Sequence, residues 1–372
     1  MTAERLYQSS LRSSSSSRAE RMTTGQNRVG KGGESSSMPQ CYSTLTANPS
    51  IGTWRECEGG AEECSPVDLG YAARQPWLPE MEQRCKVSWE SDQRGAVPMP
   101  YWTWEASECR LNTVDAESFC RVMEGRKGIL FVGDSLTGQT VDTLASILNA
   151  ESLYHQVLAY DKFSACNGAL KFSWYRNDFL DPRTTESGGF ESVHCEENDV
   201  SMSRCVVFAD DAILSEFDTL VVNAGAHRRV GGIDAYGDMM KNASEVLTAS
   251  MKRLHGNDAI MIVRNTVPGH GDGHSRMFDG PVDVDTANDI VAAGPPIYGW
   301  TSFPDKNKLL EEAFGGAGWN LLDAYTPTLL RVDSHGSVGD GLHYCVPGPV
   351  DHWITLLYNI LLVETNLAAS GG

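Results

Sequence analysis

Four short apolar runs constrain the fold of this chain more than any other feature of its sequence. They span residues 129–132, 219–222, 259–263 and 320–322, and each ends at a turn or polar residue. Amphipathic stretches lie between them, and one of these places Met240, Leu247 and Met251 on a single helical face. Buried strands that alternate with helices indicate an α/β fold with three α/β/α layers, in which helices cover both faces of a parallel sheet.

The net charge excludes one large class of partner. The chain of 372 residues carries 49 acidic and 30 basic residues, for a formal net charge of −19. A protein that binds nucleic acid needs a basic surplus to neutralise phosphates, and this chain has the opposite balance. We therefore expect no nucleic-acid partner.

The cysteines indicate an oxidising compartment. Ten of them are scattered along the chain without a Cys-x-x-Cys pair, which is typical of disulfides rather than of a zinc site. The sequon at Asn242 is consistent with a secretory route, whereas the first residues contain no apolar run that could serve as a signal peptide or anchor. Either the gene model lacks its first exon or the cysteines are reduced. We favour the first explanation, and any membrane anchoring would come from that missing segment.

Composition divides the chain into three parts. Residues 1–39 are rich in Ser, Arg and Gly, and predict a disordered, low-complexity tail. Residues 40–112 are dense in Cys, Trp, Pro and Gly, and we expect this subdomain to wrap the main domain under disulfide constraint. Residues 113–372 carry the α/β pattern and form the expected catalytic domain.

Polar residues follow the apolar runs. Sites in parallel sheets lie beyond the carboxyl ends of the strands, so these residues are the candidates for chemistry. They are Ser135 within Gly133-Asp134-Ser135, Asn223, Arg264 and, just before the last helical stretch, Asp340 and His343.

Acyl transfer needs a nucleophile, a base, a group that orients the base and donors for the oxyanion. Ser135, His343 and Asp340 can fill the first three roles, and Asn223 can fill the fourth. Two of these residues have structural alternatives, because Ser135 is also a preferred helix N-cap and Asn favours the turns at strand ends. The context of Asp340 and His343 favours the catalytic role of Ser135.

Longer blocks around these residues resemble a known family. The order Gly-Asp-Ser, strand-end Asn and Asp-x-x-His resembles the SGNH (GDSL-type) hydrolases. Residues 101–104 with Cys109, residues 130–136, and residues 340–349 with Trp353 are similar to the plant trichome birefringence-like proteins and the related PC-esterase domain. The resemblance spans about residues 100 to 362, and the block at 340–349 is its most specific part.

That resemblance implies an SGNH-hydrolase-like fold and a Golgi-lumenal O-acetyltransferase that acts on cell-wall polysaccharides. It implies a double displacement, in which a donor such as acetyl-CoA or an acetylated intermediate acylates Ser135 and a glycan hydroxyl then takes the acyl group. No tightly bound cofactor is expected. The matching blocks place Asp134 beside the nucleophile and make Cys109 and Cys345 disulfide candidates. Arg264 and His270 also match family positions, and each either contacts substrate or has a structural hydrogen-bonding role.

The chain also departs from the family pattern. Thr137-Gly138-Gln139 replaces a polar run that usually includes Arg and Asn. Ala226 stands where the family usually has His, and His227 follows one residue later. Acceptor recognition is therefore expected to differ from that of the plant enzymes. The oxyanion glycine of the second block stays unassigned, with Gly168, Gly188 and Gly189 as candidates.

Two other functions remain open at this point. One is a carbohydrate acetylesterase, in which water takes the acyl group, and the other is an inactive glycan-binding or scaffold protein. His335, His343 and Cys345 lie near one another in the sequence, but their spacing suits no common zinc pattern, so no metal is expected. The tryptophans before residue 105 could stack against sugars, although Trp is more often a core residue.

Overall fold

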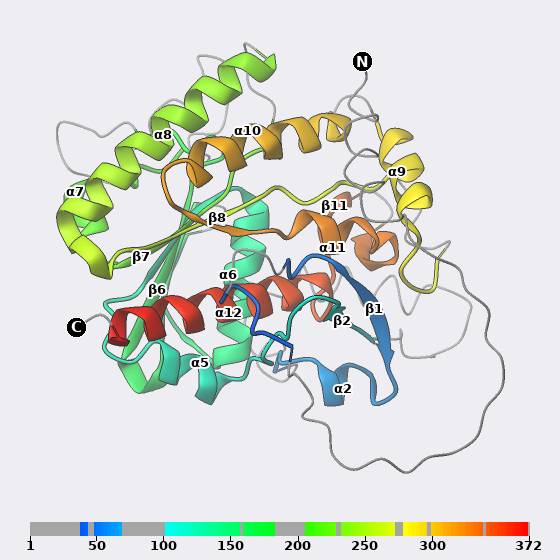
Figure 1. Ribbon diagram of the computed structural model, residues 1–372, viewed down its shortest axis with the longest axis horizontal. Coiled ribbons are helices and arrows are strands. Elements are labelled where there is room, and N and C mark those ends of the chain that lie inside the picture. The colour runs from blue at the N-terminus through cyan, green and yellow to red at the C-terminus, as the bar shows by residue number, and fades with distance from the viewer. Residues whose placement is uncertain are drawn as a thin grey trace, which may run out of the picture. The chain divides into compact units, whose positions relative to one another are not determined.

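A sheet of seven strands organises the described part of the chain (Figure 1). Its order is β4-β5-β6-β3-β7-β8-β9. The strands are β3 (Ile129–Gly133), β4 (Glu151–Gln156), β5 (Tyr160–Ala165), β6 (Leu170–Arg176), β7 (Thr219–Val222), β8 (Ile260–Arg264) and β9 (Asn320–Leu322). The computed structural model describes residues 38–43, 48–68, 101–156, 159–182, 205–227, 232–271, 278–295, 299–337 and 340–370. Except for Met38 and Pro39, the predicted tail lies outside these residues.

Two smaller hairpins and a set of helices complete the described structure. The hairpins pair β1 (Gly52–Cys57) with β2 (Tyr101–Ala106), and β10 (His335–Ser337) with β11 (Asp340–Tyr344). The helices are α2 (Gly60–Cys64), α5 (Ala116–Val122), α6 (Ser135–Leu148), α7 (Asp211–Leu214), α8 (Gly232–His255), α9 (Val284–Ala292), α10 (Phe303–Gly315), α11 (Tyr325–Leu329) and α12 (Pro349–Ser370). The boundary predicted at residue 112 stays a prediction.

Alternate residues of the central strand point to opposite faces of the sheet, and both faces are covered. Ile129 and Phe131 of β3 belong to one buried cluster, which includes residues of α5, α6 and α12. Leu130 and Val132 belong to a second cluster, with residues of α7, α8 and α10. Figure 1 shows α8 and α10 on one side of the strands and α5 and α12 on the other. The predicted α/β class is thus confirmed, with helices on both faces.

The expectation of a fully parallel sheet was wrong at one edge. β6, β3, β7, β8 and β9 are parallel, whereas β4 and β5 pair antiparallel. The short turn Cys166–Gly168 joins β5 to β6, and three successive residues in it have positive φ. A reversal this tight gives an antiparallel hairpin, because a parallel connection needs a crossover of a dozen or more residues.

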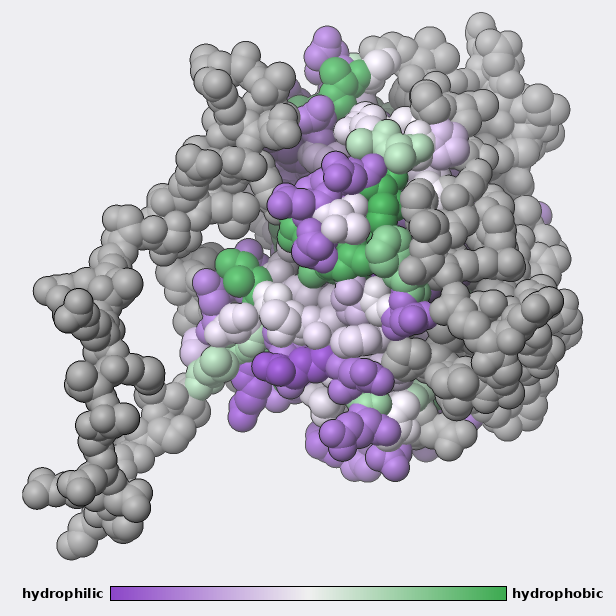
Figure 2. Space-filling view, turned by 90° about the vertical axis from the view of Figure 1, so that its right-hand side faces the viewer, coloured by the Kyte–Doolittle hydropathy of each residue, from purple (hydrophilic) through white to green (hydrophobic). Residues whose placement is uncertain are grey.

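The hairpin of β1 and β2 carries two buried tryptophans, one of which contacts α11. Trp54 donates from Nε1 to the carbonyl oxygen of Pro327 at 2.8 Å, and Trp104 donates to that of Pro49 at 2.9 Å. Both indoles are largely buried, and both also line the pocket described below. The side of the molecule that carries β1, α2 and α9 mixes hydrophobic and hydrophilic residues over short distances (Figure 2).

Disulfides fix this N-terminal region. Cys41 is bonded to Cys109, Cys57 to Cys64, and Cys120 to Cys166. Cys205 and Cys345 are disulfide-bonded as well. The prediction that Cys109 and Cys345 form disulfides is confirmed, and this many disulfides indicate an extracytoplasmic, oxidising compartment. Among the described residues, no helix combines the length and apolar character that a membrane span requires.

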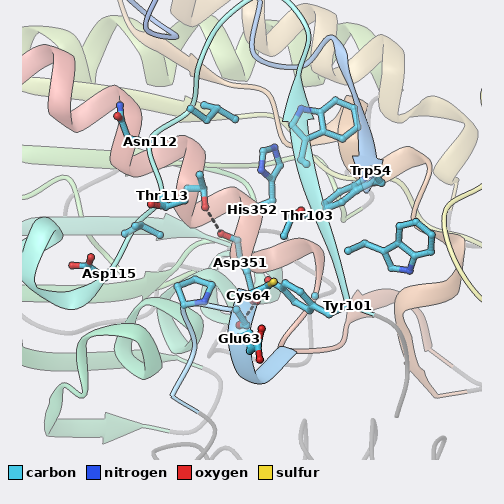
Figure 3. Close-up of a pocket in the computed structure, with 18 residues that line it drawn as sticks. Trp54, Glu63, Cys64, Tyr101, Thr103, Asn112, Thr113, Asp115, Asp351 and His352 are labelled. Atoms are coloured by element: carbon cyan, nitrogen blue, oxygen red, sulfur yellow. Dashed lines mark hydrogen bonds between the residues drawn. The ribbon is translucent and has the colours of Figure 1, made fainter. Parts of the chain in front are cut away.

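A pocket of about 440 Å³ lies where the hairpin meets the first turns of α12 (Figure 3). Trp102, Asn112, Asp351 and His352 are among its lining residues. Asp351 is buried, and its Oδ2 accepts hydrogen bonds from Ser65 Oγ at 2.7 Å and from Tyr101 Oη at 2.8 Å. Burial raises the pKa of Asp351 to about 6, although these hydrogen bonds act in the opposite direction.

Replacing Asp351 by Asn is expected to stabilise the protein at neutral pH. The folded-state pKa lies above the ordinary value, so the stability that Asp351 contributes is complete below about pH 4 and is lost as the pH rises through about 6. Asparagine keeps an oxygen that accepts from Ser65 and Tyr101 but never ionises. Urea unfolding should therefore show a gain of about 2–3 kcal/mol at pH 7.5 and little gain at pH 4. Equal gains at both pH values would contradict this account.

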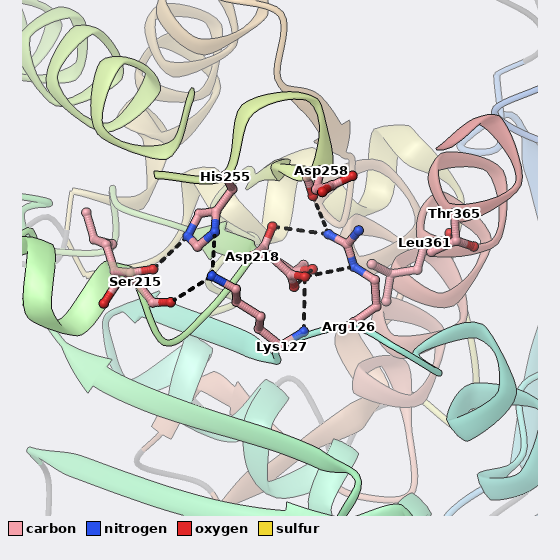
Figure 4. A network of polar contacts seen from close by, with 10 residues as sticks. Arg126, Lys127, Ser215, Asp218, His255, Asp258, Leu361 and Thr365 are labelled. Atoms are coloured by element: carbon pink, nitrogen blue, oxygen red, sulfur yellow. Dashed lines mark hydrogen bonds and ion pairs between the residues drawn. The ribbon is translucent and has the colours of Figure 1, made fainter. Parts of the chain in front are cut away.

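A polar network closes the amino end of the sheet, opposite the carboxyl ends of its parallel strands (Figure 4). Asp218 Oδ2 accepts from the backbone N–H of Lys127 at 3.0 Å and lies 3.3 Å from Nε of Arg126. Lys127 Nζ donates to the carbonyl oxygen of Ser215 at 3.3 Å and contacts Nδ1 of His255 at 3.4 Å. These contacts join the segments that precede β3 and β7 to the end of α8.

Replacing Asp218 by Ala is expected to destabilise the fold by about 3–5 kcal/mol, because it leaves the nearly buried Arg126 charge without its carboxylate. The measurement is the free energy of unfolding in urea. Glu117→Ala is a matched control, since Glu117 pairs with Arg121 at 2.7 Å on the exposed side of α5. A pair of that kind contributes at most about 1 kcal/mol. Similar losses in the two variants would refute the role given to Asp218.

Candidate active site

The turn from β3 into α6 places Ser135 at the first position of the helix. Asp134 is the N-cap, and its Oδ1 accepts from the backbone N–H of Leu136 at 3.0 Å. Gly133 adopts a φ of +158°, and a Cβ there would lie 2.4 Å from Thr137 Oγ1 and 2.8 Å from the carbonyl oxygen of Asn223. Only glycine fits this close approach, so the Gly-Asp-Ser sequence has a local structural reason at each position.

The structure brings Ser135, His343 and Asp340 together although they are far apart in the chain. Ser135 Oγ lies 2.8 Å from His343 Nε2, and His343 Nδ1 lies 2.8 Å from Asp340 Oδ2. Asp340 and His343 are both on β11, and the backbone N–H groups of Leu342 and His343 donate to Asp340 Oδ1, each at 3.1 Å. The carboxylate therefore has a fixed orientation toward the imidazole.

The charge of Asp340 is favoured by these contacts. Burial raises the pKa of a carboxyl group, but the hydrogen bond and charge of His343, with the two backbone N–H groups, outweigh burial here. The pKa of Asp340 is thus held well below its ordinary value. An ionised Asp340 beside Nδ1 keeps a proton on that nitrogen, so Nε2 is left to accept the proton of Ser135.

Side chains from α6 and from the loop after β8 hold the β10–β11 hairpin in place. Gln139 of α6 donates to the carbonyl oxygen of Tyr344, and its Oε1 accepts from the Tyr344 N–H at 3.2 Å. Gly341 packs so closely on the loop that a Cβ would lie 1.9 Å from the carbonyl oxygen of His270. The departure from the family pattern at Gln139 therefore has a structural role, because this side chain fixes the residue after His343.

His270 is buried beneath the hairpin rather than exposed to substrate. Its Nδ1 lies 2.7 Å from Nε2 of His335, and its Nε2 donates to the carbonyl oxygen of Leu329 at 3.1 Å. His335 in turn contacts the carbonyl oxygen of His343 through Nδ1, at 2.9 Å. Burial lowers the pKa of His335 to about 4, so the ring is neutral at neutral pH. These two rings support the hairpin from within the core.

Arg264 is also buried, behind the nucleophile turn. Its guanidinium lies 5.1 Å from the ring of Trp353, and Nη2 donates to Thr137 Oγ1 at 3.3 Å. Burial lowers the pKa of Arg264 to about 10, and the charge of Asp134 acts against that shift. In this structure the contacts of Arg264 are thus with the protein interior.

Asn223 lies beside the turn, but its amide is engaged. Nδ2 donates to the carbonyl oxygen of Arg264 at 3.0 Å and to Thr266 Oγ1 at 3.1 Å. A role as oxyanion donor would require a rearrangement of this amide. The backbone N–H of Ser135 is a more direct donor, because the first residue of a helix has no preceding turn to supply a carbonyl acceptor.

Of the three candidate oxyanion glycines, Gly168 is the one that the described residues include, and it is far from Ser135. Gly168 lies in the turn before β6, at the amino end of that strand, whereas Ser135 follows the carboxyl end of β3. Because β3 and β6 are parallel, Gly168 and Ser135 lie at opposite ends of these strands. Gly188 and Gly189 lie outside the described residues.

A second imidazole–carboxylate pair, which was not predicted from the sequence, lies at the same carboxyl end of the parallel strands. His227 Nε2 lies 3.2 Å from Asp178 Oδ2, and Asp178 accepts from Arg176 through both carboxylate oxygens, at 2.9 and 3.2 Å. Asp178 and Arg176 are buried. The sequence contained a partial indication of this pair, because His227 stands one residue after the position at which the family usually has His. Nothing in the sequence connected His227 to Asp178.

Comparisons with known proteins give several distant relatives of this chain. Protein trichome birefringence-like 20 of Arabidopsis thaliana is 21% identical over 309 residues, which cover 70% of this chain and 63% of that protein. Xyloglucan O-acetyltransferase 1 of the same plant is 22% identical, over 70% of each chain. This chain is a distant homologue of the trichome birefringence-like proteins. Xylan O-acetyltransferase 3 of Oryza sativa subsp. japonica, 20% identical over 72% of this chain and 67% of its own, is a third such homologue.

The chain spans a little under two thirds of the trichome birefringence-like protein, so that protein's full length is not represented here. No protein-family model matches the chain. Among solved structures, the periplasmic domain of a lipopolysaccharide acetyltransferase from Salmonella Paratyphi A is 11% identical and covers 66% of this chain and 88% of its own. Its TM-score of 0.35 is too low to carry an argument about this protein.

Proposed function

We propose that this protein is an O-acyltransferase, and more specifically an O-acetyltransferase, that acts on a glycan through an acyl-enzyme at Ser135. The observation that carries the proposal is the unbroken contact from Ser135 Oγ through His343 to Asp340, with both distances at 2.8 Å. The names of the distant homologues add the class of acceptor, since several are xyloglucan or xylan O-acetyltransferases.

The first half-reaction follows from these contacts. Ser135 Oγ attacks the carbonyl carbon of the acetyl donor while its proton passes to His343 Nε2. The bond from that carbon to the donor's leaving group then breaks, and the leaving group takes the proton from His343. Asp340 stabilises the imidazolium that forms between these two steps.

The second half-reaction repeats these steps with a new nucleophile. A hydroxyl of the glycan gives its proton to His343 Nε2 and attacks the acetyl carbon. The bond to Ser135 Oγ breaks, and Ser135 recovers the proton from His343. With water in place of the glycan the same steps give an esterase, so the outcome depends on which hydroxyl the site holds.

The remaining features of the proposal are coarser. Acetyl-CoA or an acetylated intermediate would serve as the co-substrate. The sheet would be of the SGNH-hydrolase type, with the Cys- and Trp-rich segment wrapped against residues 113–372. The disulfides, together with the homologues, support action in the lumen of the secretory pathway, and we place the protein in the Golgi.

The test is an acetyl-transfer assay with two acceptors. The protein would be incubated with acetyl-CoA or p-nitrophenyl acetate, in the presence and absence of xylan or xyloglucan oligosaccharides. Mass spectrometry would then be used to follow acetylated Ser135 and acetylated sugar. Acetylated sugar is the expected product. Free acetate that sugar does not diminish would show an esterase, and a protein that never acetylates Ser135 would overturn the mechanism.

A further inference from the structure

The second imidazole–carboxylate pair lies over the end of the nucleophile strand. β6 and β7 flank β3 on either side, with Arg176 of β6 in register with Gly133 and Val222 of β7 in register with Val132. The pairing continues one residue further, since the backbone N–H of Asn177 donates to the carbonyl oxygen of Gly133 at 3.1 Å, and Asp178 follows directly. His227 comes from the segment after β7. The contact between Asp178 and His227 therefore bridges the two flanking strands across the exit of β3.

Electrostatics agree with this placement. Burial raises the pKa of Asp178, the charges of His227 and Arg176 lower it, and the charge of Asp134 raises it. The charge of Asp134, the residue before Ser135, is the smallest of these influences, and it agrees with the position that the strand register gives to Asp178. The pair of Asp178 and His227 thus lies at the same carboxyl end of the parallel strands as Ser135 and His343.

The segment that carries His227 is held by a buried lysine. Lys306 of α10 donates from Nζ to the carbonyl oxygen of Gly225 at 2.7 Å and to that of His227 at 3.3 Å. The ammonium group also lies 5.8 Å from the ring of Tyr236 and 5.3 Å from that of Phe303. A buried lysine whose donors meet these carbonyl oxygens fixes the backbone at His227, so the imidazole has a defined position.

The contact with Asp178 also sets which nitrogen of His227 carries the proton. His227 Nε2 lies 3.2 Å from the buried carboxylate of Asp178, which also binds Arg176. This contact has the distance of an ion pair but not the geometry of a hydrogen bond. The negative charge favours a proton on Nε2. In the neutral ring Nδ1 is then a hydrogen-bond acceptor. The side chain of His227 is 23% exposed although its Nε2 is buried, so the accessible part of the imidazole lies away from Asp178.

We propose that His227 binds the acceptor: its Nδ1 accepts a hydrogen bond from a hydroxyl of the incoming glycan and holds that glycan against the acyl-enzyme. The inference rests on the proposed function. It assigns the two imidazole–carboxylate pairs to different groups, with His343 and Asp340 acting on Ser135, and His227 and Asp178 acting on the acceptor. A site that orients a sugar hydroxyl in this way favours transfer over hydrolysis, because water gains less from a single positioning contact.

The experiment compares transfer with acylation in the variant His227→Gln. The terminal amide of glutamine can take the place of Nε2 beside Asp178 but offers no group at the position of Nδ1. Each protein would be incubated with p-nitrophenyl acetate and a xylan or xyloglucan oligosaccharide. The measured quantity is the ratio of acetylated sugar to free acetate. We expect this ratio to fall about tenfold and the KM for the oligosaccharide to rise.

His155→Gln is the matched control. His155 Nδ1 lies 2.5 Å from Asp161 Oδ1, and its side chain is 29% exposed, so it forms the same kind of pair with similar exposure. It is on β4, at the outer edge of the sheet, three strands away from β3 in the strand order. This variant should keep the wild-type ratio of transfer to hydrolysis.

Three outcomes decide the matter. A lower ratio in His227→Gln, with no change in His155→Gln, supports the inference. A wild-type protein that transfers acetyl groups and a His227→Gln variant with the same ratio would refute it while leaving the proposed function intact. A wild-type protein that never acetylates Ser135 would overturn both. Nitrogen-15 shifts of His227 give an independent readout, since a proton on Nδ1 rather than Nε2 in the neutral ring contradicts the acceptor role.

Discussion

Replacing Ser135 by Ala is expected to abolish acetyl transfer, with a loss of about 10⁴-fold or more in kcat. The reason is that, in the proposed mechanism, Ser135 Oγ is the one atom of the triad that forms the covalent bond to the acetyl group. The other two members stay in place, since His343 keeps its contact with Asp340 at 2.8 Å. Any residual acetyl transfer would depend on substrate binding and on the oxyanion donors alone. It should therefore proceed without an acetylated form of the protein.

Stability separates this loss of chemistry from a loss of fold. Ser135 is at the start of α6, but the N-cap contact is made by Asp134, so the free energy of unfolding should change by less than about 1 kcal/mol. Ser146→Ala is a suitable control, because Ser146 is a buried serine further along α6. It should keep full activity. If the Ser135→Ala protein still becomes acetylated at one side chain, the nucleophile is another residue.

The sequence predicted four of the five strands in the parallel part of the sheet, because each of the four coincides with a short apolar run. β3, β7, β8 and β9 all coincide with such runs, within one residue at their ends. The same regularity predicted the triad, since sites in parallel sheets gather at the carboxyl ends of strands. Ser135 and His343 are 208 residues apart in the chain, yet this rule correctly predicts that they meet at the carboxyl ends of the strands.

The other strands were missed for a physical reason. β4 and β5 alternate polar and apolar residues or lie at the exposed edge, and β6 carries Lys171, Ser173 and Arg176 among its aromatic residues. Such segments have no continuous apolar run. The pair of Asp178 and His227 could not be predicted either, because it depends on the register of β6 against β3, and register is a property of the folded sheet.

The substrate contacts predicted for Arg264 and His270 show another limit. Both residues matched family positions, and both are buried in contacts with the protein interior. A polar residue after a strand is as useful for fixing the segments around a site as for touching a ligand. The sequence does not separate these roles, because burial of a polar side chain depends on what packs over it.

Replacing Asp340 by Asn is expected to lower kcat by about 10³- to 10⁴-fold, although the variant has almost the same shape. Asparagine can present Nδ2 where Oδ2 now faces His343 Nδ1, because Oδ1 must still accept from the two backbone N–H groups. The amide then donates to Nδ1, the ring carries its proton on Nε2, and that proton points at Ser135 Oγ. His343 in this tautomer cannot accept the serine proton.

This variant also tests the charge of Asp340 through pH. The folded-state pKa of Asp340 is below its ordinary value, so its ionised form adds stability above about pH 4, and that stability is lost as the pH falls below this value. Urea unfolding of Asp340→Asn should lack this acid-dependent loss, while its kcat stays low at every pH. Asp161→Asn is the matched control. It removes the carboxylate that pairs with His155 on the outer strands β4 and β5, and it should leave kcat unchanged. A variant that recovers activity at high pH would show that the tautomer of His343 is set by something other than Asp340.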